Sequence, residues 1–215
     1  MTWPLGTIGL VGAGLSAISM LGFVVYLFML GRPSSLTRTI AKTVAVGALA
    51  ALALHLGGSW LLVLALILSA LGDAFLAHEG DVAFLGGLGS FLAAHIAYAV
   101  LFLTIGPGFA DASLPGLLAV IAFGAGMGTL MVRKAGPLAL PVAAYVLAIA
   151  VMGLGGVTLG GLVLLGAALF MASDAILGSE KFLMPEGSRL RRLTSPAVWV
   201  LYYAGQVLIT LGLLA

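Results

Sequence analysis

Long, almost uninterrupted runs of apolar residues restrict the folds open to this chain more than any other feature. Of its 215 residues, 62% are hydrophobic and only 7% are charged. A soluble domain carries about 25% charged residues, so this chain has too little polar surface to enclose a core in water. A helix crosses a bilayer with roughly 20 apolar residues, and the runs have that length. The sequence therefore predicts an all-α, polytopic membrane protein.

Eight such runs fit the chain, and we expect eight transmembrane helices in a single transmembrane domain, residues 1–215. The runs cover residues 6–30, 36–56, 59–77, 82–105, 114–132, 137–156, 157–177 and 196–215. Glycine and proline mark several breaks between them, among them Gly57-Gly58, Gly155-Gly156 and Pro196. Because the runs do not alternate apolar and polar positions, they exclude a transmembrane β-barrel.

The basic residues predict the orientation of these helices. All nine Lys and Arg residues lie in or beside the connections that follow the first, fifth and seventh runs. Cytoplasmic loops carry an excess of Lys and Arg, so these connections are expected in the cytoplasm. With eight helices, both termini then lie outside. We expect a multi-pass integral protein of the cell membrane, or of the inner membrane if the source is bacterial.

A short acidic element occurs twice in the chain. Residues 72–79 read Gly-Asp-Ala-Phe-Leu-Ala-His-Glu, and residues 173–180 read Ser-Asp-Ala-Ile-Leu-Gly-Ser-Glu. The two copies are 101 residues apart, and the same offset aligns Arg32 with Arg133. These matches indicate two parallel four-helix halves, residues 1–105 and 106–215, related by an axis along the membrane normal.

The two copies supply the candidate catalytic residues, Asp73 and Asp174. An acid within a membrane helix is costly and is a functional-site hypothesis by default. The alternative for each is an acid at a helix end whose side chain reaches interfacial water. Both are expected near the cytoplasmic, C-terminal ends of their helices, facing one central cavity. A carboxylic acid that stays protonated near neutral pH can donate a proton in catalysis.

Polar side chains in two other runs are candidates for orienting a substrate. His95 and Tyr98 share a helical stripe of the fourth run, and Tyr202, Tyr203 and Gln206 lie mostly on one face of the last run. Each polar group needs a partner inside the bilayer. They are predicted to line a polar cavity; contacts between helices are the alternative interpretation.

Lys42 lies one or two turns inside the second run from its basic end. Snorkelling of the side chain to the interface explains this position. Neutralisation of a carboxylate or of a lipid phosphate explains it equally well. Arg189, Arg191 and Arg192 precede the last run and are expected to set topology and to touch anionic headgroups.

Several classes of site are excluded or unsupported by the residues. The chain has no cysteine, so disulfides, thiol nucleophiles and cysteine-bound metals are excluded. No two histidines share a helix at ligand spacing, so no metal site is expected. No cofactor motif is present, and no feature suggests nucleic-acid binding.

Four short patterns in order resemble the YhhN-like lysoplasmalogenase family. They are Gly-Asp-Ala-Phe-Leu at 72–76, Phe84 to Tyr98 with Gly87, Phe91 and His95, Ser-Asp-Ala-Ile-Leu at 173–177, and Tyr202-Tyr203 with Gln206. The family often has proline after the lysine at position 42, where this chain has Thr43. The resemblance implies a lysophospholipid substrate within the bilayer. It implies hydrolysis of the vinyl ether bond of lysoplasmalogens, releasing a fatty aldehyde and glycerophosphoethanolamine or glycerophosphocholine.

That chemistry suits the acidic pair. A vinyl ether is hydrolysed by protonation of carbon, which benefits from a general acid held away from bulk water. One aspartate would be the acid, while the other would stay ionised, stabilise the cation and activate water. Lys42 or a loop arginine would hold the phosphate. The alternative is a small proton-coupled transporter that uses the paired intramembrane acids.

Overall fold

The computed structural model describes residues 9–185 and 187–215, and within them the chain forms helices and no strand. The α-helices are α1 (Gly9–Met29), α2 (Leu36–His55), α3 (Trp60–Leu76), α4 (Asp81–Ile105), α5 (Leu114–Lys134), α6 (Ala139–Leu159), α7 (Gly161–Phe182) and α8 (Arg191–Leu214). A short 3₁₀ turn, Gly136–Leu138, precedes α6. The predicted all-α class is confirmed. The first expected residues of the first run, 6–8, lie outside the described part.

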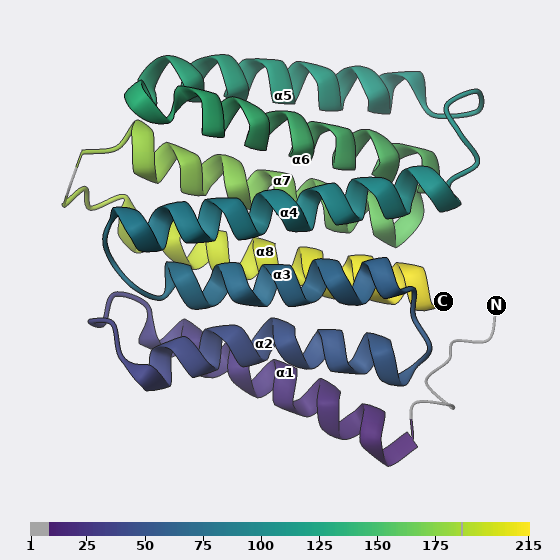
Figure 1. The fold of residues 1–215 in the computed structure, drawn as a ribbon, viewed down its shortest axis with the longest axis horizontal. Coiled ribbons are helices and arrows are strands. Elements are labelled where there is room, and N and C mark those ends of the chain that lie inside the picture. The colour runs from purple at the N-terminus through teal and green to yellow at the C-terminus, as the bar shows by residue number, and fades with distance from the viewer. Residues whose placement is uncertain (1–8, 186) are drawn as a thin grey trace.

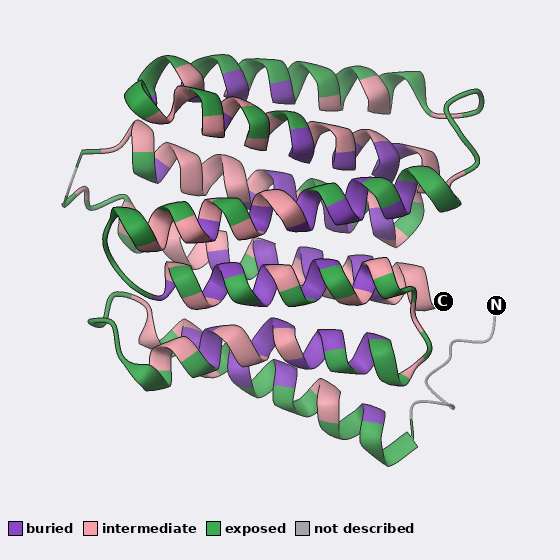
Figure 2. Ribbon diagram, viewed as in Figure 1, coloured by how far each residue is buried: buried purple, intermediate pink, exposed green. Residues whose placement is uncertain are grey.

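Six of the helices form a closed ring through their contacts, and the other two lie outside it. Figure 1 shows these two, α1 and α5, at opposite edges of the bundle. Around the ring the packed neighbours are α2, α3, α4, α6, α7 and α8, and α8 closes the ring against α2. Helix α1 packs on α2 from outside, and α5 packs on α6. Figure 2 shows the result, since α1 and α5 are mostly exposed at the two edges while the buried positions follow the ring helices.

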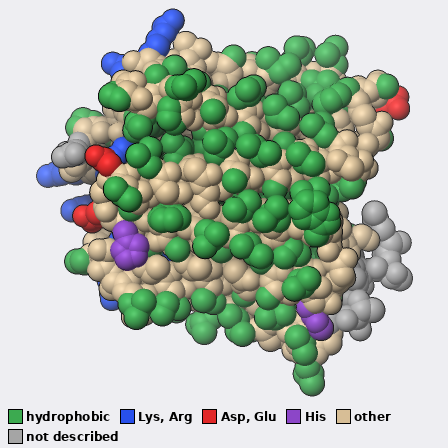
Figure 3. Space-filling view, viewed as in Figure 1, with side chains coloured by type: hydrophobic (Ala, Val, Ile, Leu, Met, Phe, Trp, Pro, Cys, Tyr) green, Lys and Arg blue, Asp and Glu red, His purple; other side chains and the backbone are tan. Residues whose placement is uncertain are grey.

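Among the described residues, seven helices are long and apolar enough to cross a membrane. The remaining one, α3, is an apolar helix of 17 residues, which spans about 25 Å at 1.5 Å per residue, near the lower limit for a crossing. The basic residues gather at one end of the bundle in Figure 3, where the connections after α1, α3, α5 and α7 lie in Figure 1. The protein is thus a multi-pass membrane protein with one basic end.

Glycine permits the closest contacts between helices. A Cβ atom on Gly166 of α7 would lie 2.7 Å from the Gly205 carbonyl oxygen of α8, and one on Gly205 would lie 2.8 Å from the Gly166 oxygen. Side chains larger than hydrogen are therefore excluded from this crossing. Gly124 and Gly128, spaced for such packing in the sequence, face Ala150 and Val146 of α6.

Several predicted helix boundaries were wrong, beginning with the end of α6. Helix α6 continues through Gly155-Gly156 and ends at Leu159, because these glycines serve packing: a Cβ on Gly155 would meet Phe102 at 2.8 Å. The turn instead uses Gly160 and Gly161, both with positive φ.

The start of α8 also differs from the prediction. It begins at Arg191, five residues before Pro196, which lies inside the helix. Its first turn is held by Glu180 of α7, whose carboxylate accepts hydrogen bonds from the hydroxyls of Thr194 and Ser195. These bonds fix the helical turn before the proline is reached.

Candidate active site

Every helix of the ring contributes one polar side chain to a site in its interior. The six residues are Lys42 from α2, Asp73 from α3, His95 from α4, Tyr145 from α6, Asp174 from α7 and Tyr202 from α8. They form two groups, each centred on one aspartate.

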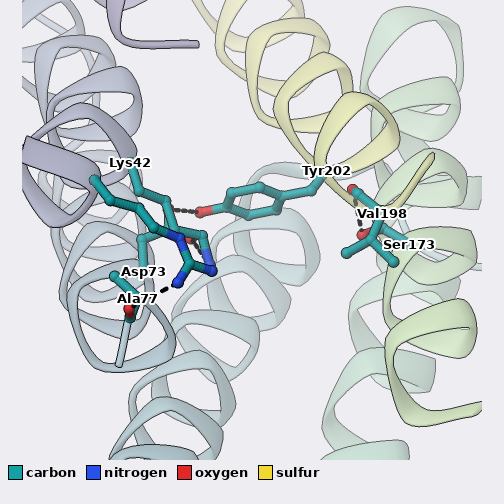
Figure 4. A network of polar contacts seen from close by, with 7 residues as sticks. Lys42, Asp73, Ala77, Ser173, Val198 and Tyr202 are labelled. Atoms are coloured by element: carbon teal, nitrogen blue, oxygen red, sulfur yellow. Dashed lines mark hydrogen bonds and ion pairs between the residues drawn. The ribbon is translucent and has the colours of Figure 1, made fainter. Parts of the chain in front are cut away.

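Asp73 has both carboxylate oxygens engaged by donors. Lys42 Nζ lies 3.3 Å from Oδ1, and the Tyr202 hydroxyl donates to Oδ2 at 2.7 Å. Figure 4 shows the Tyr202 ring reaching from α8 toward Lys42 and Asp73. The Asp73 side chain is only 1% exposed. A buried carboxylate with a cation on one oxygen and a hydroxyl donor on the other is suited to remain charged.

The ammonium of Lys42 is held on its other sides by aromatic rings. Nζ lies 5.4 Å from the centroid of the Tyr26 ring and 6.0 Å from that of Trp199. Cation–π attraction of this kind adds to the ion pair. Neutralisation of a carboxylate, one of the roles considered for Lys42, therefore matches its position; its side chain is 11% exposed.

Asp174 has a different set of partners. The Tyr145 hydroxyl donates to Oδ2 at 2.6 Å, and His95 Nε2 lies 3.4 Å from the same oxygen. Within the described residues, no Lys or Arg lies within 4.0 Å of this carboxyl group, and its side chain is 12% exposed. The expectation that it lies at the end of its helix was wrong, because α7 continues for two turns to Phe182, whereas α3 ends three residues after Asp73.

The hydrogen bonding of His95 determines which of its ring nitrogens carries a proton and which faces Asp174 as an acceptor. Nδ1 lies 2.7 Å from the Phe91 carbonyl oxygen, which can only accept, so Nδ1 carries a proton. In neutral His95 the other nitrogen, Nε2, then has a lone pair facing Asp174. Two acceptors repel unless a proton lies on one of them. Nε2 makes no hydrogen bond among the described residues, and a proton on Asp174 Oδ2 would be the donor that it lacks.

Both aspartates line one cavity of about 680 Å³, which we call the polar cavity. The matching depths of the two sequence elements predicted this shared position. Lys42 and Tyr202 line it as well, and four arginines are found in its lining. These are Arg32, Arg38, Arg191 and Arg192.

A second, smaller space shares part of its lining, including Asp174, with the polar cavity. This apolar pocket, about 60 Å³, is lined by residues of α3, α4, α5, α6 and α7, among them Phe84, Met131 and Val142. Four residues line both spaces: Leu76, Phe91, Asp174 and Leu177. Asp174 is the only ionisable one of the four, so it lies at the junction of a polar and an apolar compartment.

Four predicted orienting residues do not line either space: His95, Tyr98, Tyr203 and Gln206. His95 instead lies against Asp174. The Tyr98 hydroxyl donates to Gln206 Oε1 at 2.5 Å, and both side chains are fully buried one helical turn beyond His95 and Tyr202. Tyr203 points elsewhere: its hydroxyl lies 2.8 Å from Ser19 Oγ of α1, and its ring stacks on Phe23. Grouping Tyr203 with Tyr202 was wrong, because neighbouring helical positions point about 100° apart.

Two site residues, Tyr145 and Tyr26, were missed from the sequence. Each is a tyrosine within an otherwise apolar run. A hydroxyl within the bilayer needs a hydrogen-bond partner, and this requirement could have identified both tyrosines as candidate site residues. Tyr145 meets it on Asp174. Tyr26 contributes its ring face to Lys42 and Arg38.

Comparison with known proteins identifies the family. The YhhN family model matches residues 37–213, which include nearly all of α2 to α8. The chain belongs to the YhhN family. Within the described residues of this YhhN protein, no group of three His, Asp or Glu side chains is placed to hold a metal ion.

Two relatives of this YhhN protein carry the name lysoplasmalogenase TMEM86B. The one from Homo sapiens is 36% identical over 161 residues, which cover 74% of this chain and 65% of the relative. The one from Sus scrofa is 37% identical over 151 residues, covering 69% of this chain and 61% of the relative. The matched part of the chain thus spans less than two thirds of either relative. No solved structure is a significant match.

Proposed function

We propose that this YhhN protein hydrolyses the vinyl ether bond of lysoplasmalogens to a fatty aldehyde and glycerophosphoethanolamine or glycerophosphocholine. The names of its relatives support the substrate class. The observation that carries the proposal is the position of Asp174 between the polar cavity and the apolar pocket. A lysoplasmalogen has one polar headgroup and one hydrocarbon chain, and its vinyl ether bond lies at their junction.

The substrate pose follows from the two compartments. The headgroup lies in the polar cavity, and the first carbons of the chain lie in the apolar pocket. Because the pocket is too small for a whole lipid chain, the remainder of the chain extends between helices into the bilayer. The vinyl ether carbons then lie beside Asp174, the ionisable residue that both compartments share.

In the first step Asp174 donates its proton to the vinyl ether carbon that is not bonded to oxygen. Its protonated form suits this role because, within the described residues, no Lys or Arg pairs with it and Nε2 of neutral His95 lacks a donor beside Oδ2. The carbon–carbon π electrons form the new C–H bond, and the adjacent carbon becomes part of an oxocarbenium ion. The apolar surroundings keep bulk water from competing for the proton.

In the second step water attacks the oxocarbenium carbon and gives its proton to the Asp174 carboxylate. The resulting hemiacetal loses its hydroxyl proton while the glycerol oxygen is protonated, and aldehyde and alcohol separate. The carboxylate of Asp73 supplies negative charge that stabilises the cation. Lys42 and Tyr202 hold Asp73 in place, and His95 and Tyr145 hold Asp174. The steps use only the protein's own side chains and water.

The test is incubation of the purified protein with lysoplasmenyl-ethanolamine and detection of free aldehyde. In heavy water we expect slower turnover and one deuterium at the α-carbon of the aldehyde, because the proton transferred to carbon comes ultimately from solvent. Aldehyde without that label would rule out protonation of carbon. Release of fatty acid from ester-linked lysolipids alone would indicate another hydrolase class.

A transporter needs a path to both membrane faces. The packing of the described residues argues against such a path. One to two turns beyond the aspartates, fully buried side chains pack between the ring helices. These are Leu66, Tyr98, Phe102, Met152 and Gln206. Hydrolysis at a site open to one end therefore agrees better with the packing.

We further propose that the polar cavity opens to the cytoplasm and that both termini lie outside. The charge asymmetry of the loops supports this orientation. A cysteine introduced at Ser188, in the basic loop of this cysteine-free chain, is expected to resist an impermeant thiol reagent in intact cells and to react after lysis. Reaction in intact cells would reverse the orientation.

A further inference from the structure

The outer part of the polar cavity carries more positive than negative side chains. Beyond the Lys42–Asp73 pair and Asp174, its charged lining consists of four arginines and two glutamates. The glutamates are Glu79 and Glu180. Glu180 already accepts hydrogen bonds from Thr194 and Ser195. An excess of positive charge therefore remains in this part of the cavity.

Arg38 of α2 is fixed in place but has a donor left over. One of its terminal nitrogens, Nη1, donates to the Ala77 carbonyl oxygen at 3.4 Å, and its guanidinium lies 5.7 Å from the centroid of the Tyr26 ring. Its Nε is buried and has no hydrogen-bond partner among the described residues. A buried donor without an acceptor is costly, and a ligand oxygen would remove that cost.

Arg191, at the start of α8, shows the same combination. Nη2 donates to the Glu180 carbonyl oxygen at 2.7 Å, while Nε is buried with no partner in the described part of the chain. Each guanidinium is thus anchored by one nitrogen and leaves another unsatisfied. The two arginines come from neighbouring ring helices, α2 and α8, and line the same cavity.

Lys42 does not provide the anion site. Its ammonium lies against Asp73 and between the Tyr26 and Trp199 rings, so its charge is already compensated. Arginine also matches phosphate better, because its planar fork of N–H donors can bind two oxygens at once.

We propose that Arg38 and Arg191 form a phosphate-binding subsite that holds the headgroup phosphodiester of a single-chain phospholipid in the polar cavity. The lipid assignment rests on the proposed function, but binding does not require that the bond be cleaved. With the phosphate held by these arginines and the chain in the apolar pocket, the glycerol oxygens lie toward Asp174. The subsite would thus select lysophospholipids over neutral ether lipids.

The test measures binding without hydrolysis. The probes are hexadecyl lysophosphatidylethanolamine with a saturated ether bond, which cannot undergo vinyl ether hydrolysis, and hexadecylglycerol, which lacks phosphate. Trp199 lines the cavity, so tryptophan fluorescence reports occupancy. Arg38→Gln and Arg191→Gln are each expected to weaken binding of the phospholipid about 10-fold or more. Binding of hexadecylglycerol should change less than twofold.

Arg133→Gln is the matched control, since Arg133 is an exposed residue of α5 that lies at the same basic end and does not line the cavity. It should bind both probes like the original protein. Equal weakening of both probes by the cavity variants, or no weakening of the phospholipid, would overturn the subsite. Inorganic phosphate should compete only at far higher concentration; competition at the concentration of the lipid would assign the subsite to free phosphate. Absence of aldehyde in the hydrolysis assay, with selective binding retained, would refute only the proposed activity.

Discussion

Replacing Asp174 by asparagine is expected to lower the rate of vinyl ether hydrolysis by about 10²–10⁴-fold, the contribution of general acid–base catalysis. Asparagine keeps the shape of the side chain and can still accept from the Tyr145 hydroxyl. It cannot deliver a proton to carbon or take one from water. The initial rate of aldehyde release from lysoplasmenyl-ethanolamine measures the effect.

Asp73→Asn should cause a loss of similar order, because the carboxylate that stabilises the oxocarbenium ion is removed. The double variant should be little worse than either single one, since residues that act as a unit are not additive. Tyr98→Phe should cost less, because Tyr98 contacts Gln206 and lines neither compartment.

Asp111→Asn is the matched control, because Asp111 is exposed in the connection between α4 and α5, at the opposite end from the site. It should retain full activity. Full activity of Asp174→Asn, with correct folding of the variant, would contradict the role proposed for Asp174.

The sequence predicted the fold class and the number of helices, because length and continuous apolarity are what the bilayer demands of a helix. The turn predicted at Gly155-Gly156 was wrong because, in a sequence, a glycine at a tight contact between helices cannot be distinguished from a glycine in a turn. Only the position of Phe102 against Gly155 distinguishes them. The start of α8 was placed wrongly at Pro196 for a similar reason. The hydrogen bonds that Thr194 and Ser195 donate to Glu180 are contacts between helices, which the sequence does not reveal.

The candidate site was partly predictable. The repeated acidic element identified the two aspartates, and the polar stripes identified His95 and Tyr202. Periodicity assigns a residue to a helix face but does not name its partner. The structure was therefore needed to find that Tyr145 contacts Asp174 and that Tyr203 contacts Ser19.

The duplication of two halves remains a prediction, and the contacts follow the pattern it would produce. Each aspartate is met by the second helix of its own half: Lys42 of α2 contacts Asp73, and Tyr145 of α6 contacts Asp174. Each is also met by the fourth helix of the other half, through Tyr202 of α8 and His95 of α4. The second helix of each half therefore offers a lysine to Asp73 and a tyrosine to Asp174, and this difference underlies the roles that we propose for the two acids.

Removing the ammonium from the Lys42–Asp73 pair should have the largest effect on stability. Lys42→Met leaves the Asp73 carboxylate, 1% exposed, without its cation. Breaking a buried pair from one side typically costs about 3–5 kcal/mol. In a chain of this length that corresponds to a melting temperature lower by roughly 6–20 °C, measured by tryptophan fluorescence of the purified protein in detergent.

The double variant Lys42→Met/Asp73→Asn should be more stable than Lys42→Met alone, because no unpaired charge then remains in the ring. It should not regain activity, since the carboxylate is absent. Lys134→Met, at an exposed position of α5, is the matched control and should change stability by no more than about 0.5 kcal/mol. If the double variant were as unstable as the two single losses added together, the contact between Lys42 and Asp73 would contribute nothing as a pair. Stability regained without activity would instead separate the two roles of Asp73, as the partner of a buried lysine and as the charge that the proposed reaction requires.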